Sequence, residues 1–377
     1  MADRTPAARV FGWDVGGAHV KACVMESGRV VEVVQWACPL WQGMEKLQAV
    51  LQSARARWPG LDNARHAVTM TGEMVDLFAN REHGVTRISV ELASALSPPG
   101  SSGSIAFYAG DAGWCDASQV AARWEAIASA NWLATARHAA LHVATHAAPR
   151  VACSEGLLVD IGSTTTDLVA FRGDGVLTTA RSDAERLASG ELVYHGVVRT
   201  PLCAIARRID WGGVPHNVMN EFFATSADVY RLTGELDSAH DLHPPADNAG
   251  KDLAATRQRL ARMIGLDARD ASDTDWLIFA RAWRAAQVAE LRSNARRVMQ
   301  THGLGPQAVI VSAGCGAFLA ADVLAHDHRL LAYGSDIADV ADSALQGRAC
   351  VQSWAQVCAP SVAVAALCEQ DLSRCGS

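Results

Sequence analysis

Two short segments of this chain share one layout, and that repeat narrows the possible folds more than any other feature. Each segment begins with an aspartate at the end of an apolar stretch. A glycine stands two positions after the aspartate, and a charged residue stands seven positions after it. Apolar and β-branched residues flank both segments, which predicts a strand, a tight turn and a returning strand. The segments are Asp14-Val15-Gly16-Gly17-Ala18-His19-Val20-Lys21 and Asp160-Ile161-Gly162-Ser163-Thr164-Thr165-Thr166-Asp167.

The chemistry of these turns points to a bound phosphate group. A carboxylate at the end of a buried strand is costly unless it holds a cation, a water or a hydrogen-bond donor. Glycine lets the backbone approach an anion closely, and turn amides with Ser or Thr hydroxyls can hold phosphate oxygens. One such turn would be an ordinary hairpin, but a third glycine turn follows an apolar stretch at 312–316. The set predicts a polyphosphate cradle made by Gly16, Gly17, Ala18, His19, Gly162, Ser163, Thr164, Thr165, Gly314 and Gly316.

Composition sets the broad class of protein. The chain has 377 residues, of which 50% are hydrophobic and 19% charged, and this is typical of a globular protein with two domains. We expect domains at 1–150 and 151–377, with a helical insert at about 185–305. The formal net charge of −7 argues against a nucleic-acid partner, which would call for a basic face.

Cysteine usage and the terminal segments predict the compartment. The ten cysteines form no C-x-x-C pair, and the first residues do not have the pattern of a signal peptide. We therefore expect a reducing, cytoplasmic location. The uncharged stretch 349–368 has the length of a membrane span, but Pro360 favours the start of a second short helix. This stretch is therefore predicted to form two buried or half-buried helices, with no membrane partner.

Hydrophobic periodicity predicts alternating strands and helices. Strands are expected at 10–13, 20–25, 30–36, 67–70, 104–109, 156–159, 166–171 and 308–312. Helices are expected at 43–57, 124–146 with one break, 276–300 and 317–325. The segment 237–251 is rich in Asp, His, Pro and Gly, which indicates a loop that covers a ligand.

The three turns together resemble the phosphate-1, phosphate-2 and adenosine motifs of the actin, sugar kinase and Hsp70 (ASKHA) superfamily. The second turn looks like that of the hydantoinase/oxoprolinase branch. A narrower similarity rests on the segment 12–21 together with 186–201. It is to short proteins of that branch that are linked to tetrahydromethanopterin-dependent one-carbon transfer. Their archaeal relatives are methanofuran-biosynthesis synthases, and the resemblance extends from residue 10 to about residue 368.

The resemblance implies an α/β fold of two RNase H-like domains with the ligand in the cleft between them. It also implies a transferase that joins an aminomethylfuran-methyl diphosphate to the phenol of a tyramine- or tyrosine-type substrate. Asp14 and Asp160 would then be catalytic and hold Mg²⁺, and Lys21 would counter the charge of the leaving group, unless it is a solvated strand residue. Whether ATP or ADP binds, and whether the protein forms a homo-oligomer, stays open.

Two alternatives remain beside the transferase. One is an ATP-dependent kinase or amidohydrolase, and the other is a nucleotide-binding partner without catalytic activity. The first turn carries Ala18, His19 and Lys21 where many ring-opening relatives have Thr and a terminal Asp, which argues against the amidohydrolase.

A polar segment after the second turn supplies candidate substrate ligands. Arg186 and Arg199 suit bidentate recognition of a diphosphate or carboxylate, and Glu191 and Thr200 lie in the same segment. Ion pairs within the protein are the alternative role for the two arginines. Glu73 follows a short apolar strand and is a candidate general base for the phenol, or else a residue at the start of a helix.

Two histidine-containing segments are candidate metal sites. His138, His142 and His146 recur every four residues and would form one stripe on a helix, but no Glu or Cys completes a ligand set. The cluster from Asp237 to His243 is a candidate for Mg²⁺ or phosphate contact, with a solvated loop as the alternative.

Overall fold

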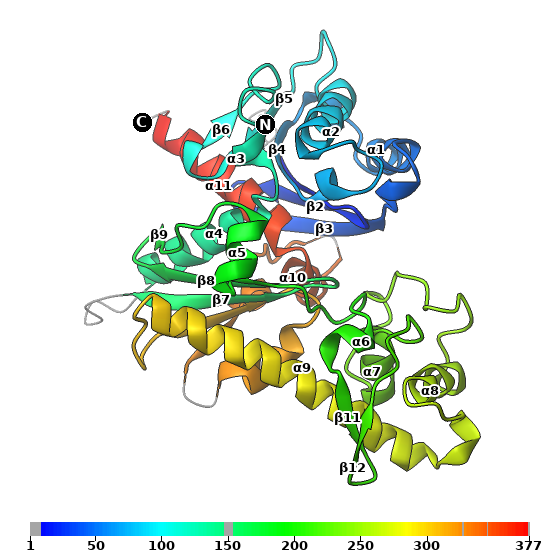
Figure 1. The fold of residues 1–377 in the computed structure, drawn as a ribbon. Helices are drawn as coiled ribbons and strands as arrows, with labels where there is room; N and C mark the ends of the chain where they lie inside the picture. The colour runs from blue at the N-terminus through cyan, green and yellow to red at the C-terminus, as the bar shows by residue number, and fades with distance from the viewer. Residues whose placement is uncertain (1–8, 147–153, 326–327, 345, 376–377) are drawn as a thin grey trace. The chain divides into compact units, whose positions relative to one another are not determined.

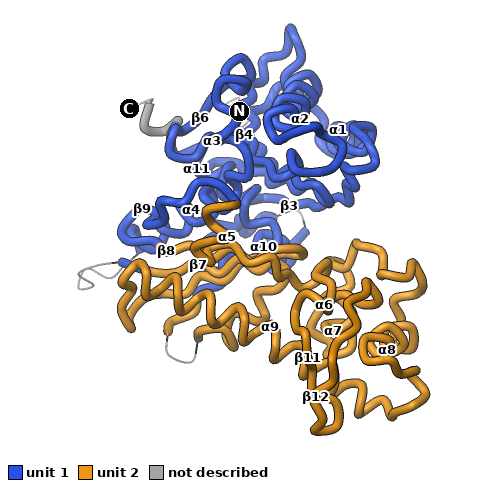
Figure 2. The backbone as a smooth tube through the Cα atoms, viewed as in Figure 1, with its two compact units in different colours: residues 1–155, 171–183, 331–377 blue, residues 156–170, 184–330 orange. Residues whose placement is uncertain are grey.

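The computed structural model describes residues 9–146, 154–325, 328–344 and 346–375. The chain forms two compact units, and neither is continuous in sequence (Figure 2). Unit 1 contains residues 1–155, 171–183 and 331–377, and unit 2 contains 156–170 and 184–330. The expected domain boundary at residue 150 lies outside the described residues and stays a prediction.

The first sheet, in unit 1, is built around the first repeated turn. Its strand order is β3-β2-β1-β4-β5-β6, in which β1 runs antiparallel to β2 and parallel to β4 (Figure 1). The strands are β1 (Arg9–Val15), β2 (His19–Glu26), β3 (Arg29–Ala37), β4 (Arg65–Met70), β5 (Ser104–Tyr108) and β6 (Trp114–Cys115). The predicted strands at 10–13, 20–25, 30–36, 67–70 and 104–109 are therefore confirmed within a few residues.

Helices cover both faces of this sheet. Alternate residues of β1, including Phe11 and Trp13, join the apolar core that α1 and α2 complete. The opposite face meets α11, where a Cβ atom on Gly12 would lie 1.9 Å from the carbonyl oxygen of Ser361. The helices of unit 1 are α1 (Glu45–Arg57), α2 (Arg81–Leu96), α3 (Trp124–Ile127), α4 (Asn131–His146), α10 (Arg348–Val357) and α11 (Ala359–Cys375).

The second sheet is built around the second repeated turn. Its order is β10-β8-β7-β13-β14, β9 pairs with β8, and β7 runs parallel to β13. This arrangement repeats that of β2, β1 and β4, because each turn-bearing strand has a hairpin partner on one side and a parallel strand on the other. The strands are β7 (Glu155–Ile161), β8 (Thr166–Arg172), β9 (Gly175–Val176), β10 (Leu192–Val193), β13 (Val309–Ala313) and β14 (Leu330–Ala332).

The region 185–305, where an insert is expected, contains mostly helices. That this region is an insert stays a prediction. Its longest element is α9, the yellow helix in Figure 1. This helix begins with a capping box, in which the Ser272 and Asp275 side chains satisfy each other's backbone amides. Trp276 and Trp283 are fully buried on it. The elements of this region are α5 (Asp183–Ser189), α6 (Leu202–Ile205), β11 (Arg208–Trp211), β12 (Val214–Asn217), α7 (Ser226–Thr233), α8 (Leu253–Arg262) and α9 (Asp273–Thr301).

Short helical turns complete the chain. The helix predicted at 317–325 is confirmed, and it consists of a 3₁₀ turn followed by a π turn. The 3₁₀ turns are Leu40–Gln42, Leu61–Asn63, Gly72–Met74, Gly110–Ala112, Ala268–Asp270 and Ala317–Leu319, and the π turns are Ala321–Ala325 and Tyr333–Ile337.

The uncharged stretch near the C-terminus forms two helices, as predicted. α10 and α11 meet at a break with a bend of 100°. In the described part of the chain, no single helix is long and apolar enough to cross a membrane. α10 and α11 reach the length and composition of a membrane span only when taken together as a bent pair. The predicted break in 124–146 is also confirmed, because α3 ends at Ile127 and α4 begins at Asn131.

Candidate functional site

The two repeated turns close with the same hydrogen bond. The amide of Gly16 donates to the carbonyl of His19 at 2.9 Å, and the amide of Gly162 donates to the carbonyl of Thr165 at 2.8 Å. In the first turn the carbonyls of Gly17 and Ala18 also accept hydrogen bonds from the amides of Leu40 and Cys38, which follow β3. The predicted hairpin layout is therefore confirmed at both places. Their role in binding phosphate stays a prediction.

Asp14 is buried at the end of β1 and has an ion-pair partner. The Lys21 ammonium lies 3.2 Å from Oδ2 of Asp14, across the register pair of β1 and β2. Oδ1 of the same carboxylate is buried and has no hydrogen-bond partner among the described residues. Lys21 therefore neutralises one side of Asp14, and the other side keeps an acceptor that a cation or a water would satisfy.

The third glycine turn packs directly against the second one. A Cβ atom on Gly314 would lie 2.2 Å from the carbonyl oxygen of Ile161 and 2.6 Å from Oδ1 of Asp160. The amide of Gly316 donates to the same carbonyl at 2.8 Å. Glycine is thus required at 314, both for this close approach and for its φ of +84°. The two predicted turns of unit 2 form one structure around Asp160.

The segment 196–199 packs against the backbone of the second turn. A Cβ atom on Gly196 would lie 2.3 Å from the amide nitrogen of Thr164. The amide of Arg199 donates to the carbonyl of Ser163 at 2.8 Å, and its guanidinium lies 3.4 Å from Oγ1 of Thr164. Burial lowers the pKa of Arg199, while the nearby Tyr194 acts in the opposite direction. The structure thus brings Arg199 to the predicted phosphate turn.

The other predicted substrate ligands make contacts within the protein. Arg186 is buried and donates to Oδ1 of Asp167 at 2.8 Å, which is the ion-pair alternative. Glu191 accepts from Ser189 at 2.9 Å and pairs with His302 at 2.8 Å. The Thr200 hydroxyl bonds both backbone groups of Gly196. Direct contact of Arg186, Glu191 and Thr200 with substrate stays a prediction.

Glu73 is buried in unit 1, directly after β4. Its side chain has 0% exposure, and Oε1 accepts a hydrogen bond of 2.8 Å from Ser129. Burial raises the pKa of Glu73, and Ser129 and Arg81 lower it in part. Arg81, Ser129 and Asp183 surround this carboxyl, and the sequence analysis did not identify them. Among them, only Asp183 lies near a predicted site residue in sequence.

The histidine stripe does not form a metal site. His138 is buried and bonds the hydroxyl of Tyr333 at 2.7 Å, while the rings of His142 and His146 stack at 4.0 Å. Among the residues that the structure describes, no group of three or more His, Cys, Asp or Glu side chains could hold a metal ion.

Ion pairs fix the loop cluster at 237–243 to neighbouring residues. Asp241 accepts from Arg231 at 2.6 and 2.9 Å and from Lys251 at 3.1 Å. Asp237 accepts from the amide of Ala239. Contact of this loop with phosphate stays a prediction, and the contacts of Asp241 are those of a structural residue.

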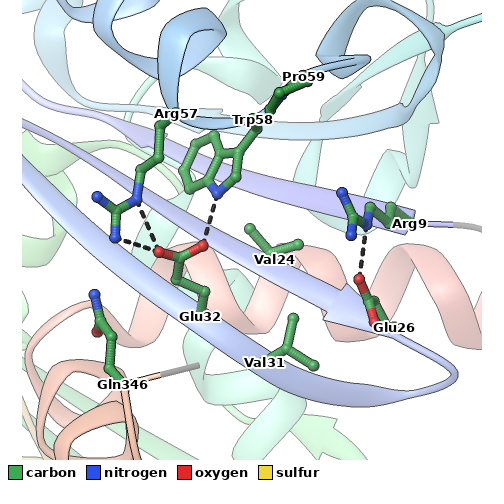
Figure 3. A pocket seen from close by; sticks show the side chains of 9 residues that line it. All are labelled: Arg9, Val24, Glu26, Val31, Glu32, Arg57, Trp58, Pro59 and Gln346. Carbon is green, nitrogen blue, oxygen red and sulfur yellow. Dashed lines mark hydrogen bonds and ion pairs between the residues drawn. The ribbon is translucent and has the colours of Figure 1, made fainter. Parts of the chain in front are cut away.

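A pocket of about 540 Å³ lies elsewhere in unit 1 (Figure 3). Glu32 holds Arg57 and the indole of Trp58 on one side, and Arg9 pairs with Glu26 on the other. Its lining is Arg9, Val24, Glu26, Val31, Glu32, Arg57, Trp58, Pro59 and Gln346, and it includes none of the predicted site residues.

Comparison with known proteins identifies the family. The model of the hydantoinase/oxoprolinase family matches residues 65–329, which include the second and third glycine turns. The chain belongs to the hydantoinase/oxoprolinase family. A solved structure of acetone carboxylase, nucleotide-free, is similar in fold, with a TM-score of 0.50 and 10% identity over 96% of this chain and 70% of that one. This likeness shows a shared fold, and the α/β class expected from the sequence is confirmed.

Two curated relatives of this hydantoinase/oxoprolinase chain carry the same name, (4-{4-[2-(gamma-L-glutamylamino)ethyl]phenoxymethyl}furan-2-yl)methanamine synthase. The protein of Methanocaldococcus jannaschii is 25% identical over 333 residues, which cover 87% of this chain and 93% of that one. The protein of Methanococcus vannielii is 27% identical over 168 residues, which cover 45% of this chain and 74% of that one. The chain is an enzyme related to these synthases.

Proposed function

We propose that this chain forms an aryl ether between an aminomethylfuran-methyl diphosphate and the phenol of a tyramine- or tyrosine-type substrate, and releases diphosphate. The observation that carries the proposal is the nearly full-length match to the Methanocaldococcus jannaschii synthase. The name of that relative contains a phenoxymethyl furan, so the bond that defines its product joins a phenol oxygen to a furan methylene carbon. The product would serve the assembly of a methanofuran-like cofactor.

The chemistry suits a protein built to hold phosphate. The furan ring delocalises positive charge at the methylene carbon, so the main tasks are to stabilise the departing diphosphate and to orient the phenol. In unit 2, Ser163 and Thr164 offer hydroxyls, and Arg199 brings a guanidinium within 3.4 Å of Thr164. These groups match the oxygens of a diphosphate, and Arg is suited to bind them in pairs.

The chemistry of the first turn would suit Mg²⁺. Asp14 has a buried oxygen without a hydrogen-bond partner among the described residues, and such an acceptor suits a hard cation. Asp160 stands at the equivalent place of its own turn in unit 2 and is the other candidate ligand. The ion would supply charge to the leaving diphosphate, while Lys21 holds Asp14 in place from the other side.

A melting scan combined with a product assay tests this proposal. Ligands are Mg²⁺ with inorganic diphosphate, ATP, ADP or a furfuryl diphosphate analogue. A ligand at a hundred times its dissociation constant adds about 2.7 kcal/mol of stability. We expect a shift with the diphosphates, its loss in Asp160→Asn, and ether formation with tyramine or its γ-glutamyl derivative. Stabilisation by ATP or ADP alone, without ether product, would favour the kinase or amidohydrolase alternative instead.

A further inference from the structure

Unit 1 contains a cluster of four polar side chains that the repeated turns do not explain. Oγ of Ser129 lies 2.8 Å from Oε1 of Glu73 and 3.2 Å from Oδ2 of Asp183. Nη2 of Arg81 donates to Oγ of Ser129 at 3.2 Å. The same nitrogen is 3.6 Å from the Glu73 oxygen and 3.8 Å from the Asp183 oxygen. Two carboxyl groups therefore share one hydroxyl and one guanidinium.

The two carboxyl groups differ in their access to solvent. The side chain of Glu73 has 0% exposure, whereas that of Asp183 has 18% and that of Arg81 has 29%. A general base must lie within hydrogen-bond reach of the proton that it removes. Of this pair, Asp183 is the carboxylate that a bound molecule can touch.

The buried partner suits a supporting role. Burial raises the pKa of Glu73, the Asp183 charge acts in the same direction, and Ser129 and Arg81 oppose them. Burial thus opposes the ionisation of Glu73. Its Oε1 accepts from Ser129, which keeps the serine hydroxyl within 3.2 Å of Asp183.

Backbone strain at Ser129 supports a special placement of its hydroxyl. Ser129 has a φ of +52°, which is a left-handed conformation that is unfavourable for a non-glycine residue. It follows Ala128, which forms a β-bridge with Met70 at the end of β4, and it precedes α4. The fold therefore fixes Ser129 between the two carboxyl groups despite this cost.

We propose that Asp183 takes the phenolic proton in the reaction proposed above, and that Ser129, Arg81 and Glu73 position its carboxylate. The inference rests on that proposed function. The phenol O–H bond breaks, and its proton goes to Asp183. The oxygen electron pair forms the bond to the furan methylene carbon, while the carbon–oxygen bond to diphosphate breaks and its electron pair leaves with the diphosphate.

The first test compares two aspartate variants of the full chain. Asp183→Asn keeps the shape of the side chain and removes the base, so kcat should fall roughly 10²- to 10⁴-fold. Asp111→Asn is the matched control, because Asp111 pairs with Arg181 at the surface of the same unit and is 61% exposed. The control should keep the wild-type kcat. A wild-type kcat in Asp183→Asn overturns the assignment.

The second test addresses positioning. Ser129→Gly accepts the left-handed backbone and removes the hydroxyl, so its melting temperature should not fall. We expect kcat to fall with KM unchanged, because the Asp183 carboxylate loses the hydroxyl that orients it while Arg81 remains. A wild-type kcat in a folded Ser129→Gly variant, or a rise in KM alone, overturns the role of Ser129.

A spectroscopic measurement separates this inference from the proposed function. A nitrated tyramine changes colour when its phenol ionises, so binding without any diphosphate donor reports proton transfer directly. Ionisation that is lost in Asp183→Asn supports the assignment, even if the wild-type protein makes no ether. The absence of ionisation in the wild type, or equal ionisation in the variant, overturns the assignment and leaves the ether-forming activity to be judged from its product.

Discussion

Gly314 and Asp160 lie so close together that a Cβ atom on the glycine would stand 2.6 Å from Oδ1 of the carboxylate. The side chain of Asp160 is thus packed against the backbone at position 314, where there is no room for a residue larger than glycine. A side chain at 314 should therefore disturb Asp160 directly.

Gly314→Ala should lower stability and abolish the melting shift caused by diphosphate. The strain of a left-handed alanine costs about 1–2 kcal/mol, and the clash adds about 1–3 kcal/mol. Gly213→Ala is the control, since Gly213 has a φ of +83° and nothing within 4 Å of an added Cβ atom. Equal losses in the two variants, measured by denaturant unfolding, would contradict the packing argument.

Arg186→Met should destabilise the protein through the loss of a buried ion pair. Arg186 and Asp167 have side-chain exposures of 1% and 13%, so removal of one partner leaves a poorly solvated charge, at a cost of about 3–5 kcal/mol. Urea unfolding measures this cost, with Arg199→Met as the comparison. If Arg186→Met keeps wild-type stability and loses only ligand binding, the arginine acts as a substrate ligand.

Thr69→Val should raise stability by about 1 kcal/mol, because it removes a buried hydroxyl that has no hydrogen-bond partner among the described residues. Thr69 is the register partner of Asp14 on the parallel strand β4. Thr166→Val is the matched control, since the Thr166 hydroxyl donates to the carbonyl of His195 at 2.6 Å, and its loss should destabilise. A destabilised Thr69→Val would reveal a bound water or cation beside Asp14.

Stability should fall as the pH drops from about 6.5 to about 4. Burial lowers the pKa of His66 and of His138 from 6.5 to about 4. In this window the unfolded state binds more protons, so each histidine removes up to about 1.4 kcal/mol per pH unit. The raised pKa of Glu73 opposes this in part. Urea unfolding at several pH values measures the dependence of stability on pH. Its slope should be shallower in His138→Gln than in the wild type. An equal slope in the two proteins would contradict the contribution of His138.

The sequence predicts the turns well because their geometry is local. The bond from Gly16 to His19 closes within four residues, and the same is true of Gly162 and Thr165. The hydrophobic pattern of the flanking strands is equally local. These features give the strands, the hairpins and the fold class.

The surroundings of Glu73 could not be predicted in the same way. Ser129 and Asp183 reach it from distant parts of the chain, and no spacing rule connects them. Long-range contacts of this kind decide the surroundings of the site.

The packing of α11 on β1 also affects how unit 1 folds during synthesis. Gly12 lies in strand β1, and the Ser361 backbone that covers it comes far later in the sequence. The sheet of unit 1 therefore has an uncovered apolar face until the ribosome has made the segment that contains Ser361. Nascent chains of this enzyme should depend on holding chaperones for longer than proteins whose N-terminal sheet is covered by neighbouring sequence.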